Sequence, residues 1–280
     1  MPADLHLHSI YSDGSFPPSE LVEMAVQKGL DTIALSDHDT VEGISEMIAI
    51  ARLKGIDVIP AIEFSTYQNG AEIHILGYYI DYNSRIFLEK VKRLFDLRLK
   101  RSEEMLEKLN RLGVEISFQD LKEIATDKYI GRPHIARAMI RAGYIKEIGE
   151  AFTDKYIGNG GRAYVEKESL SPREAIEIIK ENGGIAVLAH PFFVNGGDSL
   201  DKKGIELLVE DGLEGLEVYH SKHNQEVSAY YLEIAEELSL LVTGGSDFHG
   251  ESLPEIQIGD VLLADKYVKR FKDYYKNHRS

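Results

Sequence analysis

The sequence contains no cysteine, which excludes disulfide bonds, thiolate nucleophiles and thiolate metal sites together. It has no apolar run near the roughly 20 residues that a helix needs to cross a bilayer, and no basic-then-apolar signal pattern at its start. We therefore expect a cytoplasmic protein without a membrane partner. Excess positive charge is also missing, since 32 basic residues stand against 47 acidic ones for a formal net charge of −15. That balance argues against a protein that grips long duplex nucleic acid, but not against one that binds a small nucleotide or a strand end.

What the sequence does contain is an alternation of short apolar runs and helical stretches. At 280 residues the chain can hold one large domain, or one domain with a subdomain. The apolar runs predict strands at 3–8, 32–35, 57–64, 72–80, 184–188, 213–218 and 240–243, and a strand-like segment at 258–263. Strand–helix alternation is typical of parallel strands with crossover helices. We therefore predict an α/β fold with about seven barrel strands.

The alternation is interrupted by a mostly helical region. A long amphipathic segment at 86–112 is followed by helices expected near 118–125, 133–142 and 145–152. We predict that residues 1–83 and 164–280 form the barrel, and that 84–163 form a helical insertion domain that shapes the substrate pocket. The alternative is that the insertion is a spacer or a dimer surface.

Two histidines separated by one residue, His6 and His8, open the chain. On a strand both side chains point to the same face, where they form half of a coordination sphere for a divalent metal. A chance placement on a solvated strand is the alternative. A metal site is favoured because more histidines and acids follow at strand ends or on strand faces: Asp13, His38, Glu63, His74, His190, Asp247 and His249.

Nine nitrogen and oxygen ligands are too many for one tetrahedral zinc, so they indicate two or three divalent cations with a bridging carboxylate. Manganese, iron and zinc all suit ligands of this type, and we expect manganese to be the ion that best restores activity after chelation. Such a cluster is typical of metal-dependent hydrolases. It lowers the pKa of bound water toward 7 and stabilises charge on the attacking and leaving oxygens.

These motifs resemble the polymerase-and-histidinol-phosphatase (PHP) family from end to end. The resemblance rests on His6-x-His8, Ser12-Asp13-Gly14, Ser36-Asp37-His38-Asp39-Thr40, Glu63, His74-Ile75-Leu76-Gly77-Tyr78, Ala189-His190-Pro191 and Gly245-Ser246-Asp247-x-His249. It implies a distorted (β/α)7 barrel with a two- or three-metal site and phosphoesterase activity. It also implies three ligand sets: His6, His8, Glu63 and Asp247 on the first metal; Glu63, His74 and His190 on the second; Asp13, His38 and His249 on the third. Glu63, which bridges, and Asp247 are thereby counted as catalytic.

The insertion resembles the subgroup that acts on nucleoside 3′,5′-bisphosphates, some members of which trim short RNA from the 5′ end. The matching segments are Gly131-Arg132-Pro133-His134-Ile135-Ala136-Arg137 and Gly161-Arg162-Ala163-Tyr164-Val165. The resemblance implies that Arg132, His134 and Arg162 grip the phosphate that is not cleaved. His220 is expected to line the pocket as a phosphate ligand or leaving-group acid. The alternatives are exposed salt bridges for the arginines and a solvated loop for His220, while Asp37 and Asp39 are expected to orient His38 or nearby backbone.

The predicted reaction is metal-dependent hydrolysis of the 3′-phosphate of a nucleoside 3′,5′-bisphosphate to the 5′-monophosphate. One alternative is a 5′→3′ exoribonuclease on short RNA, in which Tyr129 or Tyr156 could stack on bases. Another is a phosphatase for a different small ester, such as histidinol phosphate. A metal-bound scaffold without activity is expected to lack one or two ligands, whereas all nine positions are filled here. The sequence predicts no oligomeric state.

Overall fold

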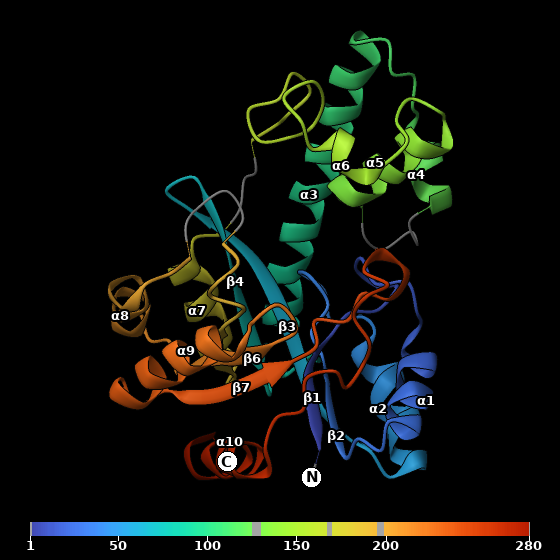
Figure 1. The fold of residues 1–280 in the computed structure, drawn as a ribbon. Coiled ribbons are helices and arrows are strands. Elements are labelled where there is room, and N and C mark those ends of the chain that lie inside the picture. Colours follow the sequence, from blue (N-terminus) through green and yellow to red (C-terminus); the bar gives the residue numbers. More distant parts are fainter. Residues whose placement is uncertain (1, 125–129, 167–169, 195–198, 280) are drawn as a thin grey trace.

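The computed structural model describes residues 2–124, 130–166, 170–194 and 199–279 (Figure 1). Seven strands form one sheet in sequence order: β1 (Ala3–Leu7), β2 (Thr32–Leu35), β3 (Asp57–Gln68), β4 (Ala71–Tyr78), β5 (Ile185–Leu188), β6 (Gly215–His220) and β7 (Leu241–Gly245). The sheet curls until its first and last strands meet. There His8 N–H donates to Phe248 O (3.1 Å) and Asp247 N–H donates to His6 O (3.0 Å). The predicted seven-stranded barrel is thus confirmed as a nearly closed one.

Helices cover the outside of this barrel (Figure 1). They are α1 (Pro18–Gln27), α2 (Ile44–Lys54), α7 (Pro172–Glu181), α8 (Lys202–Glu210), α9 (Gln225–Glu237) and α10 (Asp265–Arg279). Every residue of β1, β2 and β5 is buried, as expected for short strands covered on both faces. Within the described residues, no helix is long and apolar enough to cross a membrane.

The expectation of parallel strands throughout is wrong at β4, which runs antiparallel to both β3 and β5. The cause is the two-residue connection Asn69-Gly70, in which both residues have positive φ (52° and 89°). A two-residue turn of that kind folds the chain back into a hairpin and leaves no room for a crossover helix.

The strand-like segment 258–263 is also not a strand. Within it, Leu263 alone forms a bridge, an isolated antiparallel one to Ala3. The backbone departs from a strand at Gly259 (φ 77°), whose N–H donates to the buried carboxylate of Asp4 (2.9 Å). The carboxylate of Asp4 on β1 therefore binds the backbone N–H of Gly259, which would otherwise pair with a neighbouring strand.

A helical lobe, here called the cap, stands over one end of the barrel (Figure 1). It contains α3 (Arg85–Arg111), α4 (Phe118–Ile124), α5 (Arg132–Arg141) and α6 (Ile148–Ala151), and its buried residues form a hydrophobic core separate from that of the barrel. Helix α3 belongs to both lobes, because Phe87 and Val91 pack in the barrel core while Met105 and Leu109 pack in the cap core. The expected boundary at residue 84 is thus the start of a shared helix.

Candidate metal centre

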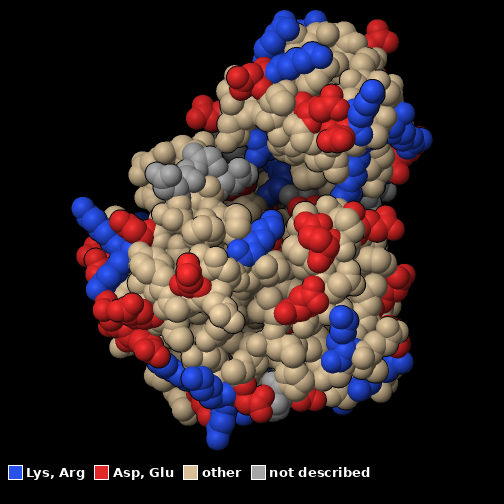
Figure 2. All heavy atoms as spheres, in the orientation of Figure 1, with Lys and Arg blue, Asp and Glu red and all other residues tan. Residues whose placement is uncertain are grey.

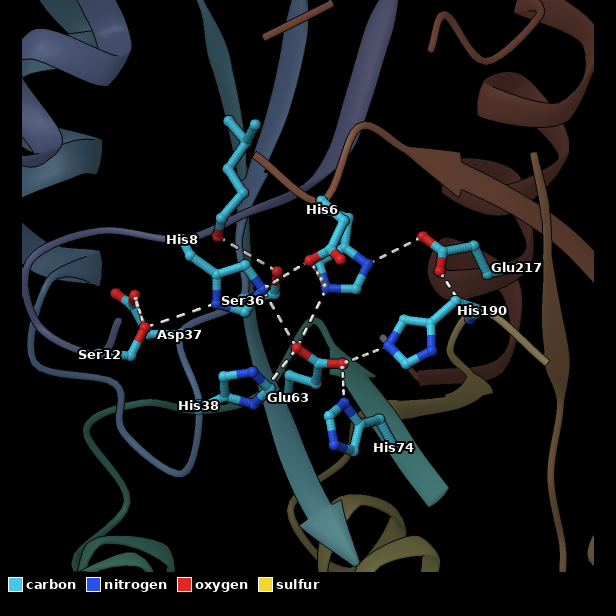
Figure 3. A network of polar contacts seen from close by, with 12 residues as sticks. His6, His8, Ser12, Ser36, Asp37, His38, Glu63, His74, His190 and Glu217 are labelled. Atoms are coloured by element: carbon cyan, nitrogen blue, oxygen red, sulfur yellow. Dashed lines mark hydrogen bonds and ion pairs between the residues drawn. The ribbon is translucent and has the colours of Figure 1, made fainter. Parts of the chain in front are cut away.

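The barrel gathers a cluster of histidines and acids at one rim, around the central Glu63 (Figure 3). Parallel strands present their carboxyl ends on the same side of a barrel, so residues at or after those ends converge. Strand β4 runs the other way, and it reaches the same rim with His74 in its first half, paired with Ser65 of β3. All nine residues predicted as ligands are brought together: His6, His8, Asp13, His38, Glu63, His74, His190, Asp247 and His249.

Three groups of candidate ligand atoms can be separated within the cluster. One consists of His6, His8, Glu63 and Asp247, and another of His8, Asp13, His38 and His249. The third group consists of His38, Glu63 and His74. His190 adjoins it, because Glu63 Oε1 lies 2.8 Å from His74 Nδ1 and 3.1 Å from His190 Nε2. Since the Oε2 atom of Glu63 faces the first group, one carboxylate spans two of the predicted metal positions.

Several of the imidazoles are oriented by hydrogen bonds that their Nδ1–H groups donate. Nδ1–H of His6 donates to Glu217 (2.9 Å), that of His190 to Phe193 O (3.3 Å), and that of His249 to Asp247 O (2.9 Å). With Nδ1 protonated, each ring turns the lone pair of Nε2 toward the carboxylates. This is the usual way in which proteins fix the tautomer of a metal-binding histidine.

The electrostatics of the cluster favour a cation. Burial lowers the pKa of His8, but hydrogen bonds to Asp247 and Glu63 outweigh it and raise the pKa to about 10. Burial likewise opposes ionisation of Glu63, but the surrounding histidines hold its pKa well below the usual range. His8 Nε2 lies 3.1 Å from Glu63 Oε2 and 3.2 Å from Asp247 Oδ1, and Asp13 Oδ1 lies 3.3 Å from His249 Nε2. The carboxylates thus draw positive charge into the cluster. A divalent metal would supply that charge in place of protons, with the histidines neutral and their ring nitrogens as ligands.

The backbone is strained where it presents these ligands. His190 (φ 24°) and Asp247 (φ 57°) adopt positive φ, which is unusual outside glycine and tends to occur at functional sites. Gly245 lets β7 approach β1, because a Cβ at this position would lie 2.4 Å from the backbone N of His6. The Gly-Ser-Asp-x-His motif therefore combines the close approach with the turn that directs Asp247 inward.

One important residue was not predicted from the sequence. Glu217 lies on β6, fully buried, and accepts hydrogen bonds from Nδ1–H of His6 (2.9 Å) and the backbone N–H of His190 (2.8 Å). Burial opposes its ionisation, but His6 outweighs that effect and holds the pKa of Glu217 below its ordinary value. The feature of the sequence that could have indicated this role is a single glutamate inside the mostly apolar strand segment Gly215–His220.

Other buried acids hold the loops of the rim, as expected for Asp37 and Asp39. Asp37 accepts hydrogen bonds from Ser9 N–H (2.7 Å) and from the hydroxyls of Ser9 and Ser12 (both 2.6 Å). Asp39 accepts one from Ser65 N–H (3.1 Å) and forms an ion pair with Arg98 of the cap. These acids fix the loops that carry the cluster.

A cationic pocket of about 250 Å³ adjoins the cluster. This arginine pocket is lined by Arg98, Arg101 and Arg132 of the cap and by Asp13, His38 and His74 of the cluster, among others. Figure 2 shows the hollow between the two lobes, with basic side chains inside it. Burial and the nearby Arg132 lower the pKa of Arg101 to about 10, as expected when like charges are crowded together. Arg132 was predicted here, whereas Arg98 and Arg101 were missed.

The structure does not bring His134 or Arg162 into the arginine pocket. His134 is buried in the cap, and its Nδ1 accepts a hydrogen bond from Gly131 N–H (3.3 Å) at the start of α5. Arg162 is exposed and does not line the arginine pocket. Of the two suggested stacking aromatics, Tyr156 is buried in the cap core. Tyr129, like residue 125 at the expected end of α4, lies outside the described residues.

His220 faces a second pocket on the barrel side of the cluster. Its Nδ1 accepts a hydrogen bond from Lys222 N–H (3.2 Å), and its Nε2 lies 3.3 Å from Asp247 Oδ2. We call this volume of about 370 Å³ the aromatic pocket; it is lined by Phe193, Lys222, His220 and Leu253 together with the cluster. The two pockets share His38 and His74, so the cluster lies between them.

Comparison with known proteins agrees with this geometry. The family described as PHP domain matches residues 4–185. A 5′-3′ exoribonuclease of Haemophilus influenzae is 35% identical over 250 residues, which cover 88% of this chain and 89% of the relative. A phosphoribosyl 1,2-cyclic phosphate 1,2-diphosphodiesterase of Eggerthella lenta is 30% identical, covering 89% and 94%. A 3′,5′-nucleoside bisphosphate phosphatase of Chromobacterium violaceum is also 30% identical, covering 88% and 86%.

Similarity extends to solved structures. A protein from Bifidobacterium adolescentis, assigned as a metal-dependent phosphoesterase, superposes with a TM-score of 0.86 at 32% identity, covering 96% of this chain and 94% of that one. The match therefore includes both the barrel and the cap. The family match covers residues 4–185, the relatives align along nearly the full length, and the histidines and acids form one cluster. This chain therefore belongs to the PHP family and is a metal-dependent phosphoesterase.

Proposed function

We propose that the enzyme hydrolyses the 3′-phosphate of nucleoside 3′,5′-bisphosphates to give nucleoside 5′-monophosphates. The observation that carries this proposal is the arginine pocket beside the ligand cluster, which gives one anion site at the metals and a second anion site next to it. A substrate with two phosphates matches two such sites, whereas a simple monoester fills only one of them. The bisphosphate phosphatase among the relatives supports the same choice.

Each group of residues has a separate task in this proposal. The nine predicted ligands hold two or three divalent cations, with manganese expected and iron or zinc also suitable. When bound, such ions supply a nucleophile from water at neutral pH and offset charge on the phosphate oxygens. The guanidinium groups of Arg98, Arg101 and Arg132 bind the 5′-phosphate, since planar N–H donors match phosphate oxygens. Binding that phosphate positions the 3′-phosphate at the cluster.

His220 fits the role of phosphate ligand better than that of leaving-group acid. Its Nδ1 accepts from the Lys222 backbone, so a neutral ring carries its proton on Nε2, beside Asp247 in the aromatic pocket. The leaving O3′ belongs to the nucleoside whose other phosphate is held by the arginines, on the opposite side of the cluster. His220 is therefore placed to donate to a phosphate oxygen that is not expelled.

Two other substrate classes follow from the relatives and from the pocket. Short RNA with a 5′-phosphate presents the same pair of phosphates, and an exoribonuclease is among the relatives. A cyclic phosphodiester is the named substrate of another. Histidinol phosphate, in contrast, carries one phosphate and a cationic amine, which the three arginines would repel.

A substrate panel tests the proposal. Manganese-loaded enzyme is incubated with adenosine 3′,5′-bisphosphate, 5′-AMP and histidinol phosphate, and released phosphate is measured. The proposal predicts preferential release from the bisphosphate with 5′-AMP as the other product. Equal rates on all three, or release of the 5′-phosphate, would contradict it.

A further inference from the structure

Glu72 lies where the arginine pocket meets the metal cluster, and the proposed function gives it no task. It stands on β4 two residues before the predicted ligand His74, so the two side chains share one face of the strand. Its Oε1 atom lies 3.9 Å from His74 Nε2, and its Oε2 atom lies 3.6 Å from Arg132 Nη2. One carboxylate is thus placed between a predicted metal ligand and an arginine of the pocket.

His74 presents its ring to the cluster in a different way from several other histidines. Three of those donate from Nδ1 and turn Nε2 toward the carboxylates. His74 instead places Nδ1 2.8 Å from Glu63 Oε1 (Figure 3), and its Nε2 points toward Glu72. A neutral imidazole that binds metal through Nδ1 carries its proton on Nε2, and a carboxylate that accepts this N–H orients the ring and makes Nδ1 a stronger ligand. Glu72 is placed to be that acceptor.

Arg132 competes with His74 for the same carboxylate. Both contacts of Glu72 are longer than a direct N–H···O hydrogen bond, which spans about 2.7–3.2 Å. A movement of about 1 Å toward His74 would complete one, but the charge of Arg132 attracts the carboxylate as well. Both side chains of this ion pair are only 15% exposed, so solvent screens the attraction weakly. A phosphate bound by Arg132 would remove the competition.

We propose that Glu72 is a positioning residue that couples the arginine pocket to the metal cluster. With the pocket empty, Arg132 holds the carboxylate away from His74. When a 5′-phosphate binds Arg132, Glu72 accepts the Nε2–H of His74 and strengthens this ligand. Metal and nucleotide therefore tighten each other's binding, and reciprocity requires the same factor for both. This inference rests on the proposed function, in which the arginine pocket binds the 5′-phosphate.

The test measures manganese affinity by competition with a chromogenic chelator, with and without saturating 5′-AMP. This nucleotide carries the 5′-phosphate and lacks the phosphate that is cleaved. In wild-type enzyme 5′-AMP should tighten manganese binding about 5-fold or more, the lower end of couplings between two sites. Glu72→Gln should bind manganese more weakly than wild type and lose most of the response to 5′-AMP, because Arg132 does not attract a neutral amide.

Glu166→Gln is the matched control for the loss of one negative charge. Glu166 is exposed and lies near Tyr67, as Glu72 does, but it does not line the arginine pocket. This variant should keep the response to 5′-AMP.

Arg132→Ala separates the role of Glu72 from direct repulsion between the arginine and the metal. Without its competitor, Glu72 should bond to His74 permanently, so this variant should bind manganese more tightly than wild type when no nucleotide is present. In the Glu72→Gln background the same change should have little effect. Direct repulsion would instead act equally in both backgrounds.

Three results would overturn the inference while leaving the proposed function intact. They are a wild-type manganese affinity that saturating 5′-AMP does not change, a full response to 5′-AMP in Glu72→Gln, and equal effects of Arg132→Ala in the two backgrounds. The proposed function is tested separately, by the preference of wild-type enzyme for adenosine 3′,5′-bisphosphate over adenosine 3′-monophosphate. Absence of that preference would reject both.

Discussion

Replacing Glu217 by glutamine should weaken metal binding without unfolding the barrel. The two carboxylate oxygens accept hydrogen bonds from His6 Nδ1–H and His190 N–H. In the glutamine variant the amide oxygen still accepts one of these hydrogen bonds, but the acceptor is no longer charged, which costs about 1 kcal/mol. The amide NH₂ group cannot accept the other hydrogen bond, and its loss costs about 1 kcal/mol more. The sum of about 2 kcal/mol corresponds to about 30-fold weaker metal affinity, within the range known for groups that orient metal ligands.

The assay is competition between the enzyme and a chromogenic chelator for manganese. Glu214→Gln is the matched control, because Glu214 lies three residues away, just before β6, and bonds to Tyr274 instead of the cluster. We expect weaker manganese affinity in the Glu217 variant alone, with activity partly recovered at high metal concentration. Unchanged affinity in the Glu217 variant would refute the role given to this carboxylate.

Three further predictions concern the cluster and the cap. Chelation should abolish phosphate release and lower the melting temperature, because metal binds only the folded chain, and manganese should restore both. Full activity in excess chelator would exclude the metal mechanism. Asp247→Ala should abolish turnover while the far-UV circular dichroism spectrum persists, and retained turnover would mean that the ligand set is wrong. Burial lowers the pKa of His134 to about 4. The nearby Asp13 opposes this shift, and the positive charges of Arg137 and Arg98 add to it, so the side chain is neutral in the folded protein. Its unfolded form takes up a proton below about pH 6.5, so wild-type protein should lose up to about 3 kcal/mol of stability as the pH falls from 6.5 to 4. His134→Gln should show a shallower decline in urea unfolding over that window, and an identical decline would refute this assignment.

The order of elements and the convergence of the histidines and acids could be predicted from the sequence because both depend on local patterns. Short apolar runs ending in histidine or aspartate mark strands, and the carboxyl ends of parallel strands converge at one rim of a barrel. The same reasoning missed the antiparallel hairpin, although Asn69-Gly70 is a strong turn signal. Strand–helix alternation on both sides led to a uniform parallel interpretation.

The residues that support the cluster were harder to predict because their roles depend on tertiary contacts. Arg98 and Arg101 lie three positions apart on a charged helix, a pattern typical of a face exposed to solvent. Their pocket exists only because α3 extends from the barrel into the cap. Arg162 was chosen by resemblance of a short segment, yet its side chain is exposed. His134 matched the same kind of motif, and the structure shows it capping α5.

In the proposed function, the cap arginines bind one substrate phosphate while the other is cleaved at the cluster. The most direct measurement is the ratio of kcat/KM for adenosine 3′,5′-bisphosphate to that for adenosine 3′-monophosphate, in wild-type enzyme and in Arg132→Ala. Arg132 also bonds to Asn159 (2.9 Å), so Asn159→Ala controls for indirect effects on the cap. We expect a high ratio in wild-type enzyme. It should fall about tenfold or more in the Arg132 variant, as for a lost charged hydrogen bond, and change little in the control. A ratio near one in wild-type enzyme, or a ratio that Arg132→Ala leaves unchanged, would contradict the proposed function.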